Sequence, residues 1–215
     1  MDGGSGSQQD PELISFQHLR QAIGFLGVAL PLVLAIGKLA TQGAGLEPTI
    51  SQYYHTDMRN YFVGSLCAIA VFLMSYRGYD RRDLLAGRLG FLFAIGVAFF
   101  PTTPQGESLT LVGGLHLASA VSLFLTFAYM CWFLFTQTDP NKSPTPRKLK
   151  RNTVYRVCAV LILLLLVATA VVMLTPLHTT LATCVPVFWL ESATVVTFGV
   201  GWLTKGERIL KDEQP

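Results

Sequence analysis

The sequence predicts an all-α membrane protein, a polytopic membrane helix bundle of about six transmembrane helices with both chain ends in the cytoplasm. Of its 215 residues, 51% are hydrophobic and 13% are charged, against about 25% charged residues in a typical soluble domain. The apolar residues form blocks of roughly 20, the length that crosses a hydrocarbon core about 30 Å thick. The basic residues lie between these blocks and at the chain ends, so they indicate membrane topology and argue against nucleic-acid binding.

Polar segments separate the first three apolar blocks. Residues 19–39 follow a tail rich in Gly, Ser and Gln, residues 1–17, which is predicted to be disordered. We interpret this block as a retained span and not as a signal peptide, because no Lys or Arg precedes Arg20. The second block, 61–76, ends before the charged turn RGYDRRD, and the third, 84–100, ends before a proline.

The last three blocks complete the predicted bundle. Residues 112–135 form the fourth, residues 154–174 follow the basic segment TQTDPNKSPTPRKLKRN, and residues 185–203 form the sixth. The transmembrane domain is therefore expected to cover residues 18–204, with a charged cytoplasmic tail at 205–215. No polar stretch is long enough to build the core of a separate soluble domain.

The distribution of positive charge sets the expected topology. With six spans and a cytoplasmic N-terminus, only Lys38 and Arg59 of the 16 Lys and Arg residues lie on the outer side. Five or seven spans would place a basic cluster on the wrong side of the membrane. The membrane itself is not specified: a bacterial inner membrane, a eukaryotic plasma membrane and an internal membrane all fit this pattern.

Glu191 is the most informative polar residue, because it is the only acidic residue well inside a predicted span. Ionisable groups inside a membrane are costly and usually face the bundle interior or water. Together with His55, His116 and Ser119, Glu191 predicts a polar pocket near the outer face. The alternative is a structural role, in which Glu191 pairs with His116 or with a neighbouring Ser or Thr.

Three histidines, His55, His116 and His178, fall in the same outer layer. Neutral imidazoles with one carboxylate suit zinc, and a histidine side chain also suits a pH sensor. No two of the three are spaced three or four residues apart, so no local motif supports a ligand pair. No cofactor is expected otherwise, since the four cysteines form no CxxC pair and predict neither a disulfide framework nor a thiolate zinc site.

Ser51 and His55 form an SxxxH stretch that is followed by Asp57. It resembles the SxxxH motif of the alkaline ceramidase and progestin-receptor-like superfamily of membrane hydrolases. The resemblance implies a zinc-dependent hydrolase site that uses Ser51, His55 and Asp57. The chain departs from that superfamily because it has about six predicted spans and not seven, and because it lacks the late HxxxH motif.

The basic stretch TPRKLKRN between the fourth and fifth blocks is a candidate contact for anionic lipid headgroups, worth about 1 kcal/mol for each basic residue. The alternative is that this stretch only fixes the topology. The residues concerned are Arg147, Lys148, Lys150 and Arg151.

Read end to end, the chain resembles the six-span DRAM/Frag/Sfk-like family, which includes the damage-regulated autophagy modulators and related bacterial membrane proteins. The elements that carry the resemblance are Pro48-Thr49-Ile50-Ser51, Tyr76-Arg77, the segment HLASA from His116, and Trp189 near Glu191. The outer-loop segment QYYHTDMR departs from the Gly-containing stretch of those relatives. The resemblance implies a membrane protein that associates with lipids or partner proteins and supplies no catalytic residues.

Three functions follow as hypotheses. The favoured one is a non-enzymatic scaffold, lipid-associated organiser or sensor, whose partners are membrane lipids, other membrane proteins or further copies of this chain. The second is a metal-dependent membrane lipid hydrolase that uses His55, His116 and His178. The third is a small proton-coupled transporter or channel with Glu191 in its pathway.

Overall fold

The structure is a computed structural model that describes residues 11–43, 45–139, 141 and 143–211, with side chains from residue 16 onward except at positions 178 and 179. The described residues form helices and no strand, as the sequence predicts. Six helices have 16 or more residues: α1 (Pro11–Gln42), α2 (Arg59–Met74), α3 (Arg81–Phe99), α4 (Leu111–Tyr129), α5 (Pro146–Leu174) and α7 (Pro186–Lys205). The shorter helices are η1 (Ser51–His55), the π-helical turn η2 (Met130–Leu134) that continues α4, α6 (Leu177–Thr180) and η3 (Ala182–Cys184).

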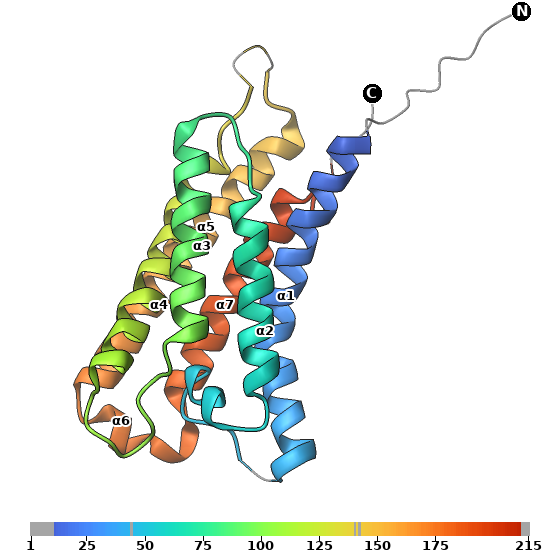
Figure 1. Cartoon of the computed structure of the whole chain (residues 1–215). Coiled ribbons are helices and arrows are strands. Elements are labelled where there is room, and N and C mark those ends of the chain that lie inside the picture. Colours follow the sequence, from blue (N-terminus) through green and yellow to red (C-terminus); the bar gives the residue numbers. More distant parts are fainter. Residues whose placement is uncertain (1–10, 44, 140, 142, 212–215) are drawn as a thin grey trace, which may run out of the picture.

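The six long helices pack as a closed ring. Each packs mainly on the helices before and after it, and α7 closes the ring by packing on α1 (Figure 1). The start of α1 and the end of α7 lie at one end of the bundle, together with the α2–α3 and α4–α5 connections, whereas η1 and α6 lie at the other end. We call these the terminal end and the loop end.

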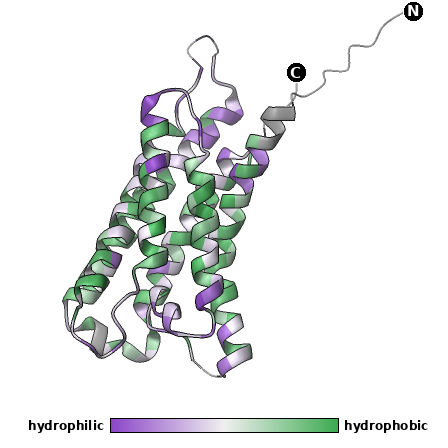
Figure 2. Ribbon diagram, in the orientation of Figure 1, coloured by the Kyte–Doolittle hydropathy of each residue, from purple (hydrophilic) through white to green (hydrophobic). Residues whose placement is uncertain are grey.

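Four of the helical segments are long and apolar enough to cross a membrane. The outside of the bundle is correspondingly apolar, with Leu111 83% exposed and Leu164 60% exposed, and Figure 2 shows hydrophobic residues along the helices and hydrophilic ones towards both ends of the bundle. Such extensive apolar exposure is typical of a surface that contacts lipid. Of the other two helices, α2 has only 16 residues and α3 begins with several charges. The four segments cover residues 16–42, 111–134, 146–174 and 182–205.

Two helices begin earlier than the sequence predicts. Helix α1 starts at Pro11, inside the tail that was predicted to be disordered, and residues 1–10 lie outside the described residues. Helix α5 starts at Pro146, so the end of the basic segment is helical. Proline favours the first turn because its missing N–H needs no partner there. At α5 the Thr145 hydroxyl also caps the helix by accepting from the Lys148 amide at 3.0 Å.

Small residues allow α1 and α7 to approach closely. A Cβ atom on Gly24 would lie 2.8 Å from the amide nitrogen of Leu203 and 2.9 Å from the carbonyl oxygen of Gly199. A Cβ on Gly199 would in turn lie 2.8 Å from the Gly24 carbonyl oxygen. The two backbones therefore touch at a pair of glycines, the packing mode that membrane helices favour.

The turn between α2 and α3 is organised around Asp83, which is 0% exposed. Its carboxylate accepts hydrogen bonds from the Tyr76 hydroxyl at 2.9 Å, from the Tyr79 amide at 3.1 Å and from the Asp80 amide at 3.2 Å. Asp80 returns the interaction by accepting from the Asp83 amide, which makes a capping box at the start of α3.

Candidate functional site

The connection between α1 and α2 folds back over the loop end of the bundle. Within it, Ile50 is 5% exposed and Tyr53 is fully buried. An ion pair of 2.6 Å between Lys38 and Glu47 holds the start of this connection to α1. We call residues 46–58 the outer loop.

Glu191 of α7 holds the centre of the outer loop. Its Oε2 accepts a hydrogen bond of 2.7 Å from the backbone amide of Ile50. Without Glu191 the Ile50 amide would lose this acceptor. A hydrogen bond to a charged group contributes more than one between neutral groups, about 1.5–3 kcal/mol.

His116 of α4 holds the next residue of the same loop. Its Nδ1 lies 2.7 Å from the Phe100 carbonyl oxygen, and its Nε2 lies 2.9 Å from Ser51 Oγ. A carbonyl oxygen only accepts, so Nδ1 carries a proton, and in the neutral imidazole Nε2 then accepts from the Ser51 hydroxyl. Both ring nitrogens are thus occupied, and His116 has none left for the predicted pairing with Glu191.

A small cavity lies directly beneath Ile50 and Ser51. Its volume is about 70 Å³, below the range of about 300–1,000 Å³ that ligand pockets occupy. Its polar lining comes from Ser51 and Glu191, while the remaining walls are apolar and belong to α1, α2, α3, α4 and α7. The apolar side chains are those of Leu30, Ile50, Phe62, Leu66, Ile69, Val97, Ala120, Leu123, Phe124, Phe127, Val195 and Phe198.

The other residues of the predicted pocket lie nearby but contact different groups. His55 is exposed, and its Nε2 lies 2.8 Å from the Thr102 carbonyl oxygen, so it fastens the outer loop to the α3–α4 connection. The Ser119 hydroxyl donates to the Leu115 carbonyl oxygen of its own helix at 2.8 Å. Asp57, the third residue of the hydrolase motif, is exposed at the end of the loop.

The predicted zinc ligands do not form a cluster in the described part of the chain. No group of three His, Cys, Asp or Glu side chains among those residues is arranged to hold a metal ion. The side chain of His178 lies outside the described residues. His116, which both zinc and pocket hypotheses share, already uses its two ring nitrogens within the protein.

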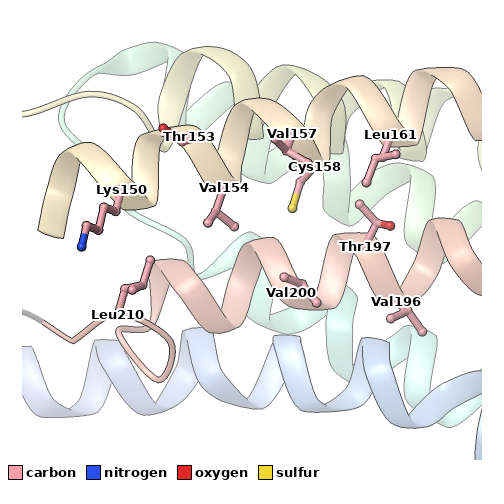
Figure 3. A pocket seen from close by; sticks show the side chains of 10 residues that line it. All are labelled: Lys150, Thr153, Val154, Val157, Cys158, Leu161, Val196, Thr197, Val200 and Leu210. Atoms are coloured by element: carbon pink, nitrogen blue, oxygen red, sulfur yellow. The ribbon is translucent and has the colours of Figure 1, made fainter.

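The basic residues predicted to meet lipid headgroups separate into different environments. Lys150 lies at one end of a groove of about 480 Å³ between α5 and α7 (Figure 3). The groove faces outward and is lined mainly by valine and leucine side chains, with Thr153, Cys158 and Thr197 among them. Lys148 and Arg151 line a second cavity at the terminal end. Arg147 donates a hydrogen bond to the backbone carbonyl oxygen of Lys211.

Glu191 and His116 could be predicted as site residues from the sequence, but their hydrogen-bond partners could not. The partners are the Ile50 amide, the Ser51 hydroxyl and the Phe100 carbonyl oxygen, of which two are backbone groups with no sequence signature. The proline that ends α3 was the available signal, because it frees the last carbonyls of the helix for side-chain partners. The apolar residues beneath the loop were indistinguishable from ordinary core.

The arrangement is therefore a polar site made by two ionisable side chains that hold one loop over an apolar cavity. Comparisons with protein-family models, with curated proteins and with solved structures find no match to this chain.

Proposed function

We propose that this chain is a six-span membrane protein of the damage-regulated autophagy modulator type that acts as a lipid-responsive sensor or organiser and not as an enzyme. The observation that carries the proposal is the joint anchoring of Ile50 and Ser51, by Glu191 at 2.7 Å and by His116 at 2.9 Å. Two ionisable side chains in the outer part of a bundle are expensive to maintain in a membrane, and here both hold the same short loop.

Two observations support the proposed membrane topology. Helices α2 and α3 complete the same ring as the four long apolar segments, so a bilayer that surrounds the ring surrounds them as well. The starts of α1, α3 and α5 and the end of α7 lie at the terminal end. Most Lys and Arg residues belong to these segments and to the connections beside them, so the positive-inside rule assigns this end to the cytoplasm. The outer loop then faces the outer leaflet.

In this proposal the outer loop is a lid. The cavity of about 70 Å³ is smaller than ligand pockets, which measure about 300–1,000 Å³, so a lipid enters only when Ile50 and Ser51 move away. An amphiphile whose polar group donates to Glu191 replaces the Ile50 amide, and its hydrocarbon part enters the apolar space below. Each anchoring bond contributes about 1–3 kcal/mol, a range that a bound ligand can offset.

Photo-crosslinking tests this directly. A phosphatidylethanolamine, whose ammonium group can donate to Glu191, carries a diazirine in its acyl chain and is reconstituted with the protein. The sample is irradiated, and the labelled peptides are mapped by mass spectrometry. We expect labelling of the cavity residues Leu66 and Phe124, and more of it in His116→Ala, which releases Ser51 but keeps the Glu191 acceptor. Glu107→Gln, which removes an exposed carboxylate in the α3–α4 connection, is the control. Labelling confined to exterior residues such as Leu164, and equal in all three proteins, contradicts the lid.

A second candidate is suggested by the Ser51–His116 pair. A serine hydroxyl donating to a histidine whose other nitrogen is fixed by an acceptor is the arrangement that activates a serine nucleophile. The Ser51 oxygen would attack an ester carbonyl while His116 Nε2 takes its proton and later passes it to the leaving alcohol. Water would then release the acyl group from the serine. A fluorophosphonate probe decides between the candidates, because covalent labelling lost in Ser51→Ala supports hydrolysis and absence of labelling supports the sensor.

A further inference from the structure

A second polar cavity lies at the terminal end, at the opposite end of the bundle from the outer loop. Its volume is about 640 Å³, and it is enclosed by α1, the α2–α3 connection, the α4–α5 connection, α5 and the segment after α7. Four of its lining side chains are cationic and two are carboxylates. They are Arg20, Arg77, Lys148 and Arg151, and Asp139 and Glu207.

Contacts with the protein hold three of these cations in place. Arg151 is 5% exposed, and its Nη1 donates to the Leu210 carbonyl oxygen at 2.9 Å. Lys148 Nζ donates to the Phe135 carbonyl oxygen at 2.7 Å. The Arg20 guanidinium lies over the Tyr76 ring at 6.0 Å. Their charges are therefore positioned before any ligand arrives, which lowers the entropy lost on binding.

The cationic side chains exceed the carboxylates among the described residues that line the cavity. One of the two carboxylates, Glu207, has its Oε1 3.7 Å from Arg151 Nη1, longer than a charge-assisted hydrogen bond of about 2.7–2.9 Å. An incoming anion can therefore compete with Glu207 for Arg151.

We propose that this cavity binds a phosphate-bearing anion through Arg20, Lys148 and Arg151. A cavity of this size is within the range of about 300–1,000 Å³ that small-molecule sites occupy, so it accommodates a phosphate together with the group that carries it. Arginine is favoured at such sites because its planar guanidinium donates two parallel hydrogen bonds to phosphate oxygens. The N-terminus of α5, which begins at Pro146, adds a favourable partial charge nearby.

Two sources supply this chemistry. The terminal end is the one that positive charge assigns to the cytoplasm, so the phosphate can belong to an anionic lipid of the inner leaflet or to a soluble organic phosphate. Arg77 lines the cavity and is exposed, so a lipid headgroup and a soluble phosphate can both reach it. The proposal is independent of the outer lid, because it uses none of the same residues.

The test measures binding of two probes to the full chain. Phosphatidic acid binding is measured by native mass spectrometry against phosphatidylcholine, and pyrophosphate binding by thermal stabilisation in a neutral detergent without anionic lipid. Arg20→Gln and Lys148→Gln remove cavity cations. Arg81→Gln and Lys150→Gln are matched controls, since both residues are exposed at the same end and neither lines the cavity.

We expect the cavity variants to weaken binding by about tenfold or more, the loss typical of a hydrogen bond between charged groups. The controls should weaken it by about threefold or less, the effect of one screened surface charge. Stabilisation by pyrophosphate identifies a soluble phosphate, and phosphatidic acid binding alone identifies a lipid headgroup. Arg77→Gln replaces Arg20→Gln if the latter fails gel filtration. Equal weakening by cavity and control variants, or no binding of either probe, overturns the proposal.

Discussion

Ile50 and Glu191 are 141 positions apart in the chain, yet the Ile50 amide donates a hydrogen bond of 2.7 Å to the Glu191 carboxylate. This bond joins the outer loop to α7, the helix that closes the ring against α1. The neighbouring residue, Ser51, is held from α4 by His116. Changes at Glu191 or His116 should therefore affect the loop first and the bundle second.

Replacing Glu191 should destabilise the protein more when the new side chain has no hydrogen-bond acceptor. Glu191→Gln keeps a neutral acceptor and should cost about 1 kcal/mol, whereas Glu191→Leu leaves the Ile50 amide buried without a partner and should cost about 1–3 kcal/mol. Thermal unfolding in a mild detergent measures both. Glu107→Gln should behave as the wild type; equal loss in all three would point to a general charge effect.

His116 and His55 provide a matched pair of histidine substitutions. His116→Ala removes two hydrogen bonds from a residue that is 3% exposed and should cost about 2–3 kcal/mol. His55→Ala removes one bond at an exposed residue and should cost about 1 kcal/mol or less. Unfolding midpoints from the same assay rank the two, and the reverse order would contradict the proposed role of His116.

The contact between Gly24 and Gly199 predicts a strict size limit. Alanine at either position would bring a Cβ to within 2.9 Å of backbone atoms, so the helices must separate, at a cost of about 1–3 kcal/mol. Gly64→Ala is the control, because nothing lies within 4 Å of a Cβ at that position. Loss of the monodisperse gel-filtration peak should occur in the first two variants, while an unaltered Gly199→Ala protein would show that the helices can part freely.

Within the terminal end, substitutions in the turn around Asp83 should destabilise the protein most. Asp83→Asn replaces one accepting oxygen with a donor beside three donors, so it should cost about 3 kcal/mol or more. Tyr76→Phe loses a single hydrogen bond and should cost less, about 1–2 kcal/mol. Asp80→Asn, at an exposed cap, should be the mildest of the three. Expression yield and unfolding temperature give the ranking.

The zinc content of the purified protein distinguishes the sensor hypothesis from the zinc-hydrolase hypothesis. Elemental analysis of the purified protein should find no stoichiometric zinc, because the ring nitrogens of His116 are bonded to Ser51 and Phe100. About one zinc per chain, lost in His116→Ala, would favour the hydrolase hypothesis instead.

The helical bundle could be predicted from the sequence, and the start of two helices could not. Apolar blocks of the right length specify the helices because only internally hydrogen-bonded segments are stable in lipid. The early starts of α1 and α5 escaped prediction because polar, proline-containing segments resemble loops. Beyond the membrane the start depends on capping, such as that by Thr145, and not on hydropathy.

The candidate site was only half predictable for a different reason. The depth of Glu191 in its apolar block marks it as unusual, but its partner is a backbone amide, which every residue except proline carries. Ser51 and His116 are 65 positions apart, so no local spacing encodes their contact. The cavity at the terminal end draws its cations from α1, α5 and the α2–α3 connection, and only the folded ring brings these together.

Amide hydrogen exchange at Ile50 and Ser51, measured on the protein in lipid nanodiscs, tests the lid most directly. The account predicts slow exchange in the wild type, and exchange in Glu191→Leu that is faster by about tenfold or more, the factor that corresponds to about 1.4 kcal/mol. Amides in α5 should exchange equally in both proteins. Unchanged exchange at Ile50 and Ser51 in Glu191→Leu would contradict the account, because Glu191 would then not hold the loop.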